Sequence, residues 1–472
     1  MGAFITSYLP ELVMLAGTLV LFFITLGDRR GVLARRVALV TALATVTACV
    51  MALPAEEVLF EGAYRVDGFS QILKLFLSVG LFFALLAAGG LQDIPSDFRP
   101  EFYLFTILGG FGLVTLVSCV DLLTMVVALQ MASFPLYLLV PLRREREGQR
   151  AQMESAAKYI MFGIAANGIM LFGLSYLYGL TGTTALAGVM HQIRGVAESP
   201  LALAGLALTC CGLFYKLAVF PFHFWTPDVY EGSSHESAAI ISSLPKLGAV
   251  AVLARLTALA TPENPRFALL LAVLATASMF YGNLAALVQT DLKRLLGFSG
   301  IAHAGHTVVG LVALDSDGRA AALYYLFAYL FMILASFLVV CRVSTDGRNV
   351  GLSELAGLHR RSPLLAWTLL LAVFGLAGVP PLAGFIGKLA LLKAALAKGW
   401  LWLVVLTVIN SAIAIYYYLL MVREAFFKDA TPEAPRIGLD AATQLLCVLL
   451  MVAILALGVF PGRLLAFLSV VG

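Results

Sequence analysis

Apolar residues dominate the chain in runs of roughly 20 residues, the length of helix that crosses a lipid bilayer. The runs recur from end to end and are separated by short polar segments. The pattern predicts about fourteen transmembrane helices in one all-α bundle, because a backbone in lipid satisfies its hydrogen bonds as a helix. Two shorter mixed stretches, 183–197 and 349–358, predict either interfacial helices or ordered loops. The predicted spans lie near residues 7–27, 36–53, 69–90, 102–119, 121–141, 157–179, 201–223, 238–259, 267–289, 296–314, 320–341, 364–397, 402–426 and 442–468.

The run from 364 to 397 is too long for one straight span. It contains Pro380 and Pro381, and prolines remove backbone hydrogen bonds from a helix. We interpret it as one broken helix, and Pro221 and Pro227 predict a similar break in the other half of the chain. Two broken helices in corresponding halves are typical of a transport pathway between internal repeats. The alternative is two incidental proline kinks, since kinked membrane helices are common.

Composition supports an integral membrane protein in a lipid bilayer. Of 472 residues, 61% are hydrophobic and only 12% are charged, unlike a soluble protein. The net charge of +4 is small and dispersed, so nothing here favours binding to nucleic acid. The six cysteines lie in or beside apolar runs without CxxC spacing, and we interpret them as small apolar residues, not disulfides or metal ligands.

Basic residues gather in alternate loops, which predicts the orientation of the chain. The positive-inside rule places these loops in the cytoplasm and both termini on the outer face. Acidic residues fall in the opposite loops, at Glu56, Glu57, Glu61, Asp67, Asp315 and Asp317. The basic loops carry Arg29, Arg30, Arg35 and Arg36; Arg143, Arg144, Arg146 and Arg150; Lys293 and Arg294; Arg342, Arg348, Arg360 and Arg361; and Arg423 and Lys428.

Four lysines fall within predicted spans and are the first candidates for chemistry: Lys158, Lys216, Lys246 and Lys388. A lysine charge at the bilayer centre costs roughly 2.5 to 3.5 kcal/mol, so such a side chain is expected to face a polar interior. A lysine removed from water gives up its proton more readily, which makes a proton relay the functional prediction. The alternatives are that Lys216 reaches a helix end and that Glu154 and Lys158 form an ordinary helix pair. We expect Lys293 and Arg294 to anchor a helix end.

Histidines lie near the same segments. His223 and His235 flank the link between the seventh and eighth spans, and His303 and His306 share one face of the tenth. Histidine titrates near neutrality and can pass protons, although a satisfied core histidine is an equal reading for His306. Metal binding at His303 and His306 lacks an acidic or cysteine partner nearby in sequence. The sequence has no phosphate loop, dinucleotide fingerprint or GxSxG elbow, so no nucleotide, iron–sulfur or acyl chemistry is expected in this chain.

Three segments carry a resemblance to a known family. They are FPFHFWTPDVYEG from Phe220, GNLAALVQTDLKRLLGFSGIAHAGH from Gly282 and GVPPLAGFIGKL from Gly378. They resemble, in order, the hallmark motifs of the antiporter-like membrane subunits of respiratory complex I, and the resemblance spans essentially the whole chain. Within that family, PDVYEG and a lysine at position 388 are similar to the subunit N group of bacterial NADH-quinone oxidoreductase.

The resemblance implies an organisation and an activity. It implies N-terminal helices in 1–100, two inverted five-helix repeats in 101–262 and 263–430, and a C-terminal helix in 431–472. It implies proton translocation in a bacterial inner membrane, beside other membrane subunits of the complex. NADH, FMN, iron–sulfur clusters and quinone are expected in partner subunits, with no cofactor bound by this chain. The family's polar axis maps onto Lys216, Lys246 and Lys388, with His303 as a bridge, Lys158 as a further channel lysine and His223 as a candidate relay member.

One position departs from the family. Where the family places a glutamate in the middle of the fifth helix, this chain reads LTMVVALQMASFPLYLL and has Gln130. Glutamine can hydrogen-bond but cannot change charge. Three alternatives follow: a relay with an altered trigger, a structural subunit that does not pump, or a subunit of a multi-subunit cation/proton antiporter or hydrogenase-like complex.

Overall fold

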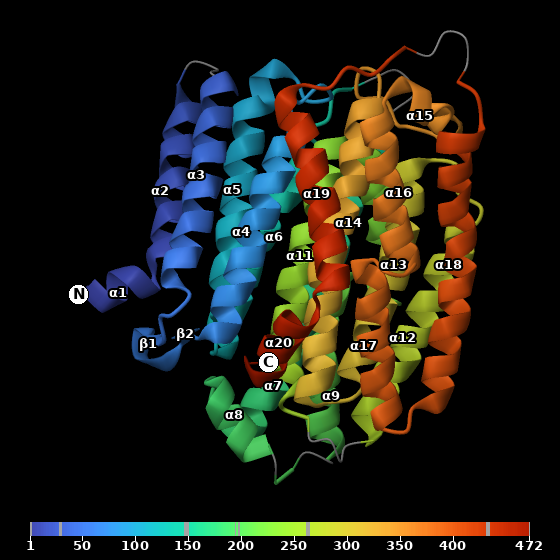
Figure 1. Cartoon of the computed structure of the whole chain (residues 1–472). Helices are drawn as coiled ribbons and strands as arrows, with labels where there is room; N and C mark the ends of the chain where they lie inside the picture. Colours follow the sequence, from blue (N-terminus) through green and yellow to red (C-terminus); the bar gives the residue numbers. More distant parts are fainter. Residues whose placement is uncertain are drawn as a thin grey trace.

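The computed structural model describes residues 2–27, 31–145, 151–193, 195–196, 199–260, 265–430 and 435–471. Arg29, Arg30, Arg146 and Arg150 of the predicted basic loops lie outside these ranges. Figure 1 shows a bundle of helices with one short hairpin, β1 (Glu57–Leu59) and β2 (Tyr64–Val66). The helices are α1 (Gly2–Ser7), α2 (Leu9–Leu26), α3 (Gly31–Ala52), α4 (Gly68–Ala88), α5 (Arg99–Leu116), α6 (Leu122–Leu139), α7 (Ala151–Thr181), α8 (Leu186–Ile193), α9 (Pro200–Leu217), α10 (Trp225–Gly232), α11 (His235–Thr257), α12 (Pro265–Ala286), α13 (Leu292–Leu311), α14 (Ser316–Val343), α15 (Leu358–Arg361), α16 (Pro363–Ala377), α17 (Ala383–Ala397), α18 (Leu401–Phe427), α19 (Ala441–Val459) and α20 (Gly462–Val471).

The predicted all-α membrane fold is confirmed. Within the described residues, eleven helices are long and apolar enough to cross a membrane. The more polar α5 and α13, together with the broken pair α16 and α17, complete the fourteen predicted spans. One predicted span is wrong in its extent: 442–468 is not a single helix, because α19 ends at Val459 and α20 starts at Gly462. Pro461, between them, cannot continue the hydrogen-bond ladder of α19.

Both predicted helix breaks are present and are built alike. α9 ends before Ala218 and α16 before Gly378, and both residues adopt a left-handed backbone conformation (φ 68° and 89°). A left-handed residue at this position ends a helix, because its N–H bonds back to the last turn. The following residue repeats the pattern: Val219 N–H donates to Phe214 O and Val379 N–H to Phe374 O. The chain resumes as α10 and α17, so each break lies inside the bundle.

The element order α5–α11 recurs as α12–α18 with inverted direction. α5 and α6 pack together as α12 and α13 do, and α7 packs on α9 as α14 packs on α16 and α17. Asp121 caps α6 and pairs with Ala185, whereas Asp291 caps α13 and pairs with Gly351. These two antiparallel bridges fall at the short mixed stretches of the sequence: the first stretch contains the helix α8, and the second a single 3-10 turn, Leu352–Leu355. The repeat boundaries themselves stay a prediction.

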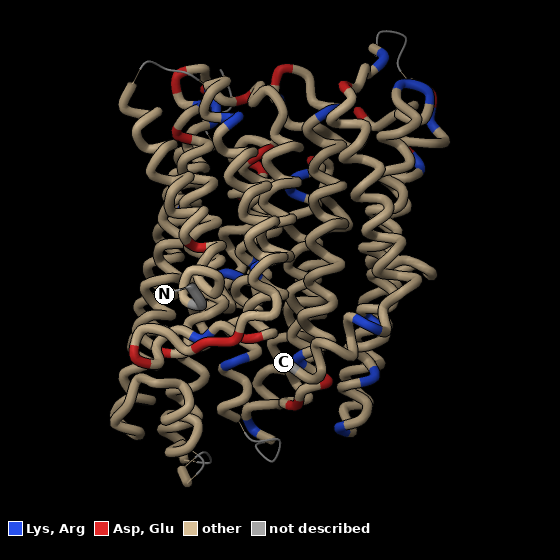
Figure 2. Tube along the Cα trace, turned by 60° about the vertical axis from the view of Figure 1, so that its left-hand side comes forward, with Lys and Arg blue, Asp and Glu red and all other residues tan. Residues whose placement is uncertain are grey.

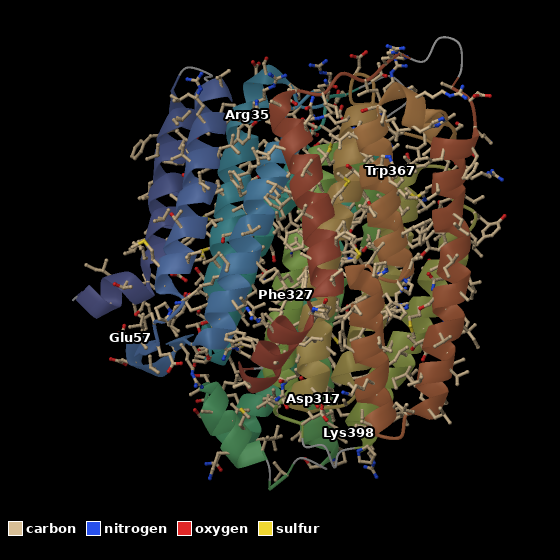
Figure 3. All side chains as sticks on the ribbon, viewed as in Figure 1. Arg35, Glu57, Asp317, Phe327, Trp367 and Lys398 are labelled. Atoms are coloured by element: carbon tan, nitrogen blue, oxygen red, sulfur yellow. The ribbon has the colours of Figure 1, made fainter. Side chains whose placement is uncertain are left out.

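Charged side chains gather at the two ends of the bundle (Figure 2). Figure 3 shows Arg35 at one end and Glu57 and Asp317 at the other. We call these the basic end, which also holds α15 with Arg360 and Arg361, and the acidic end. The acidic end also carries Lys398, whose ammonium pairs with Asp315 at 3.0 Å. The separation agrees with the alternating loops of the sequence, while the direction of insertion stays a prediction.

A buried arginine fastens several segments near the basic end. Arg143 Nε lies 2.6 Å from Asp93 Oδ2, and the exposed fractions of the two side chains are 4% and 1%. The same guanidinium donates to Glu231 O, Gly347 O and Asn349 Oδ1 at 3.0, 3.1 and 2.7 Å. It therefore joins the ends of α4, α6, α10 and α14.

Replacing Arg143 with alanine is expected to destabilise the fold. The change removes the cation beside a buried carboxylate, which typically costs about 3 kcal/mol or more. Thermal unfolding of the purified complex should show a lower midpoint for Arg143→Ala. The matched control is Arg360→Ala, because Arg360 pairs with Asp429 on the surface at 2.8 Å and exposed pairs contribute little. Equal midpoints for the two variants would contradict this account.

Candidate functional site

Lys216 lies at the end of α9, immediately before the first break, and its side chain is buried inside the bundle. Its Nζ lies 5.0 Å from the ring centroid of Tyr137 and 5.5 Å from those of Tyr159 and Tyr215. Among the described residues it has no hydrogen-bond partner. Three tyrosine rings therefore surround the ammonium, an arrangement that stabilises a cation through the ring faces. The break helps to build it, since Trp225 Nε1 of α10 donates to Tyr215 O at 3.0 Å.

Gln130, in the place of the family glutamate, bonds to an amide. Asn167 Nδ2 of α7 donates to Gln130 Oε1 at 3.0 Å. Asn167 in turn approaches α9 at Gly212, where an added Cβ would lie 3.2 Å from Asn167 Oδ1. Gly212 is one helical turn before Lys216. A neutral amide pair thus stands beside this part of α9, and neither member can take up a proton near neutral pH.

Lys246 connects the first repeat to the second. It follows Pro245 in α11, and its Nζ donates to Gly300 O of α13 at 2.9 Å. The Nζ also lies 5.2 Å from the ring centroid of Tyr329 in α14. An added Cβ at Gly300 would lie 2.9 Å from the lysine Nζ, so the ammonium would have to shift. The lysine therefore lies in a tight, buried contact among three helices.

His303 lies one turn beyond Gly300 on α13, between two tyrosines. Its Nδ1 is 2.6 Å from Tyr325 Oη and its Nε2 is 2.9 Å from Tyr418 Oη. A tyrosine hydroxyl can both donate and accept, so both ring nitrogens belong to one hydrogen-bond chain. The positive charges of Lys246 and Lys388 both act on this imidazole. The bridging role that the resemblance implied for His303 stays a prediction.

Lys388 lies one turn beyond the start of α17, just after the second break. Its Nζ donates to Ala377 O at 2.9 Å, and Ala377 is the last residue of α16. The carbonyls of a helix end lack intrahelical partners, so the break supplies the acceptor. Tyr325 packs against this helix at Gly387, where an added Cβ would meet Tyr325 Cδ2 at 2.7 Å. Tyr325 thus touches both His303 and the helix of Lys388.

These residues form a buried cluster, which we call the polar axis: Lys216, Lys246, His303 and Lys388 with their tyrosines. Between Lys216 and Lys246 the connection is aromatic. Tyr159 stacks on Trp225 at 4.5 Å between ring centroids, and Trp225 contacts Tyr230 at 6.4 Å. The axis consists of lysines, a histidine and tyrosines, and the described residues contain no group of three or more His, Cys, Asp or Glu side chains that could hold a metal ion.

Other candidates lie outside the polar axis. His223 is buried in the first break between Phe220 and Tyr281, and neither ring nitrogen has a partner among the described residues. His306 bonds to Ala302 O and Ser411 Oγ, as a core histidine does.

The structure decides between the alternatives for Lys158 and contradicts the expectation for Lys293. Lys158 forms the helix pair with Glu154 at 2.7 Å and also pairs with Asp228 at 2.6 Å. Its side chain is 37% exposed, in a network near the basic end that includes Arg294. Lys293 does not anchor a helix end at the surface, because it is fully buried and its Nζ donates to Ser233 O at 2.6 Å.

Sequence reasoning missed the tyrosines and one ion pair. Tyr325 and Tyr329 lie four residues apart on α14, a spacing that places both on one helix face and was a usable signal. Glu11 and Lys74 form a buried ion pair between α2 and α4. No spacing rule joins two residues of different helices, so that pair could not be predicted from the sequence.

Comparison with known proteins identifies the family of this chain. Residues 119–414 match the model of the family described as NADH:quinone oxidoreductase/Mrp antiporter. The NADH-quinone oxidoreductase subunit N 2 of Opitutus terrae is 59% identical over 97% of this chain and 95% of its own length. A chain of respiratory complex I from Thermus thermophilus superposes with a TM-score of 0.83 at 33% identity, over 97% of this chain and 98% of that one.

A chain of the Mrp complex of a Dietzia species has a TM-score of 0.86 at 22% identity, over 98% of this chain and 96% of that one, a likeness of fold alone. The family match and the near-complete alignment with subunit N lead to one conclusion. This chain belongs to the NADH:quinone oxidoreductase/Mrp antiporter family of membrane subunits, and within it to the subunit N group.

Proposed function

We propose that this chain translocates protons as subunit N of an NADH-quinone oxidoreductase, driven by electron transfer from NADH to quinone in partner subunits. The observation that carries the proposal is the polar axis itself. It places three buried lysines and a doubly hydrogen-bonded histidine between the two broken helices. Such residues are costly in a membrane and are the usual components of proton pathways.

The contacts supply a means of moving protons along the axis. The Lys246 ammonium donates a hydrogen bond to a carbonyl oxygen. The lysine can therefore release its proton without the formation of a new ion pair. His303 accepts a proton at one ring nitrogen and donates from the other, with a tyrosine hydroxyl at each. Lys246 and Lys388 both act electrostatically on His303, so a change of charge on either lysine reaches the imidazole.

Gln130 changes how the proton on Lys216 is held in this scheme. A carboxylate beside Lys216 would hold its proton by charge, whereas the tyrosine cage and the Gln130–Asn167 amide pair have no net charge. We infer that an acidic neighbour in α6 does not control the proton on Lys216 in this chain. The same observation supports the second candidate, a structural subunit whose first repeat does not pump.

The remaining parts of the proposal concern partners and place. We propose that the chain binds no redox group, and that NADH, FMN, iron–sulfur clusters and quinone belong to partner subunits. It would assemble with other membrane subunits in a bacterial inner membrane, as the bacterial relatives support. An antiporter or hydrogenase-like assembly is disfavoured because the named relatives at high identity are subunits of NADH-quinone oxidoreductase.

Removing Lys216 or Lys246 is expected to stop pumping without preventing assembly. Redox-driven proton uptake would be measured in inverted membrane vesicles for wild type, Lys216→Ala and Lys246→Ala, with the assembled complex quantified in each. We expect a fall of roughly tenfold to a hundredfold, as for loss of a proton-transfer group. Lys398→Ala is the control, because Lys398 is a surface lysine paired with Asp315. Normal pumping by both relay variants would leave the structural alternative.

Changing Lys388 to arginine separates charge from proton transfer. Arginine keeps a cation near Ala377 O but does not release its proton in proteins. We expect Lys388→Arg to assemble and to lose about as much pumping as Lys388→Met, on the order of tenfold. Lys398→Arg should match wild type. Pumping by Lys388→Arg at the wild-type rate would show that this position needs only a positive charge.

A further inference from the structure

A second buried ion pair lies outside both repeats, in the N-terminal helices. Lys74 Nζ of α4 is 2.7 Å from Glu11 Oε1 of α2, and both side chains are completely buried. The polar axis does not use either residue. The pair is also unlike the surface pairs of this chain, such as Arg360 with Asp429, where both side chains are mostly exposed.

Tyr64 completes the pair from the hairpin. Its hydroxyl donates to Glu11 Oε1 at 2.5 Å, and the Lys74 ammonium lies 5.2 Å from its ring centroid. The hairpin is fixed there, because Tyr64 forms a bridge with Cys119 and Arg65 N–H donates to Ser118 O. Glu11 Oε2 has no partner among the described residues. The carboxylate thus has one donor that remains if the lysine loses its charge.

Burial makes a purely structural role of the Glu11–Lys74 pair energetically unfavourable. Removing two ions from water costs several kcal/mol each, and apolar residues of similar volume commonly replace such a pair without loss of stability. Ionisable residues in membrane spans are therefore functional sites by default. Here α2 and α3 present mostly apolar surfaces, so packing alone does not require charges.

The lysine of the pair lies on a helix that packs against two helices of the polar axis, and it is nearer the acidic end than these helix contacts. α4 packs on α11 and α14, with Gly80 against Leu244 and Leu330. Phe76 stacks on Phe327 at 3.8 Å between ring centroids, and Figure 3 shows Phe327 in the middle of the bundle. Leu244 is two residues from Lys246, whereas Lys74 lies six residues before Gly80, or about 9 Å along the helix toward the acidic end.

We propose that Glu11 and Lys74 form a second proton-exchange site, through which protons pass between the polar axis and the acidic end. An N–H bond of the Lys74 ammonium breaks and the proton passes to water on the acidic side. The electron pair stays on the amine, and Glu11 remains a carboxylate held by Tyr64. A proton from the side of Lys246 then restores the ammonium. Glu11 acts electrostatically on Tyr8, Cys49 and Tyr64, and Lys74 acts on Cys49 and Cys119, so these are the titratable groups that face the pair. The inference rests on the proposed proton translocation.

Lys74→Arg tests this site in the assembled complex. Arginine keeps the ion pair with Glu11 but does not give up its proton. We expect normal assembly and a fall in redox-driven proton pumping of roughly tenfold. Lys398→Arg is the matched control and should pump like wild type. If Lys74→Arg pumps at the wild-type rate while Lys246→Arg is impaired, the result would overturn this site alone. If Lys246→Arg also pumps normally, the result would instead overturn the proposed function.

Two further variants keep the test decisive if arginine does not fit. Glu11→Gln with Lys74→Met removes both charges and keeps the approximate volume. A structural pair predicts that this double variant assembles and pumps normally, whereas a proton site predicts assembly with pumping reduced about tenfold. Tyr64→Phe retains both charges and the ring but removes the hydroxyl that holds Glu11. Reduced pumping by Tyr64→Phe supports the site, and an unchanged rate counts against it.

Discussion

A positive charge inside a bilayer needs a partner, and this requirement explains how the buried lysines of this chain are surrounded. Lys246 and Lys388 bond to backbone carbonyls, Lys216 lies among tyrosine rings, and Lys74 pairs with Glu11. The helix end at Ala377 supplies the acceptor for Lys388, because the last carbonyls of a helix lack intrahelical partners. Lys246 instead bonds to the carbonyl of Gly300 within the continuous helix α13. The two breaks follow from the same left-handed turn before a proline, and they put polar backbone at the centre of the bundle.

The inverted repeats are alike in backbone but differ in the charges they place there. Gln130 comes nine residues after the cap Asp121, and Gly300 nine residues after the equivalent cap Asp291. One position carries an amide that bonds to Asn167, and the other offers only a carbonyl to Lys246. Neither repeat therefore has a carboxylate in that place. Lys246 in the first repeat and Lys388 in the second both act electrostatically on His303, so the imidazole is where charge changes in the two repeats meet.

The sequence predicted the features that depend on local chemistry. Apolar runs located the spans, and proline with glycine located both breaks. The depth of a residue in the membrane was harder to predict. Lys158 lies in a predicted apolar span, yet it belongs to an ion-pair network near the basic end, because Asp228 and Glu154 hold it there. Contacts between distant helices were out of reach, which is why the tyrosines around Lys216 and His303, and the Glu11–Lys74 pair, became visible only in three dimensions. Only the resemblance joined the candidate residues into one axis.

The central claim is that protons cross from one repeat to the other through His303. The most direct measurement is the number of protons pumped per electron pair delivered to quinone, compared between His303→Ala and His306→Ala. His306 shares the helix and its degree of burial, but its bonds go to Ala302 O and Ser411. The account predicts a lower proton ratio for His303→Ala and an unchanged ratio for His306→Ala. An unchanged ratio for His303→Ala in a fully assembled complex would contradict it.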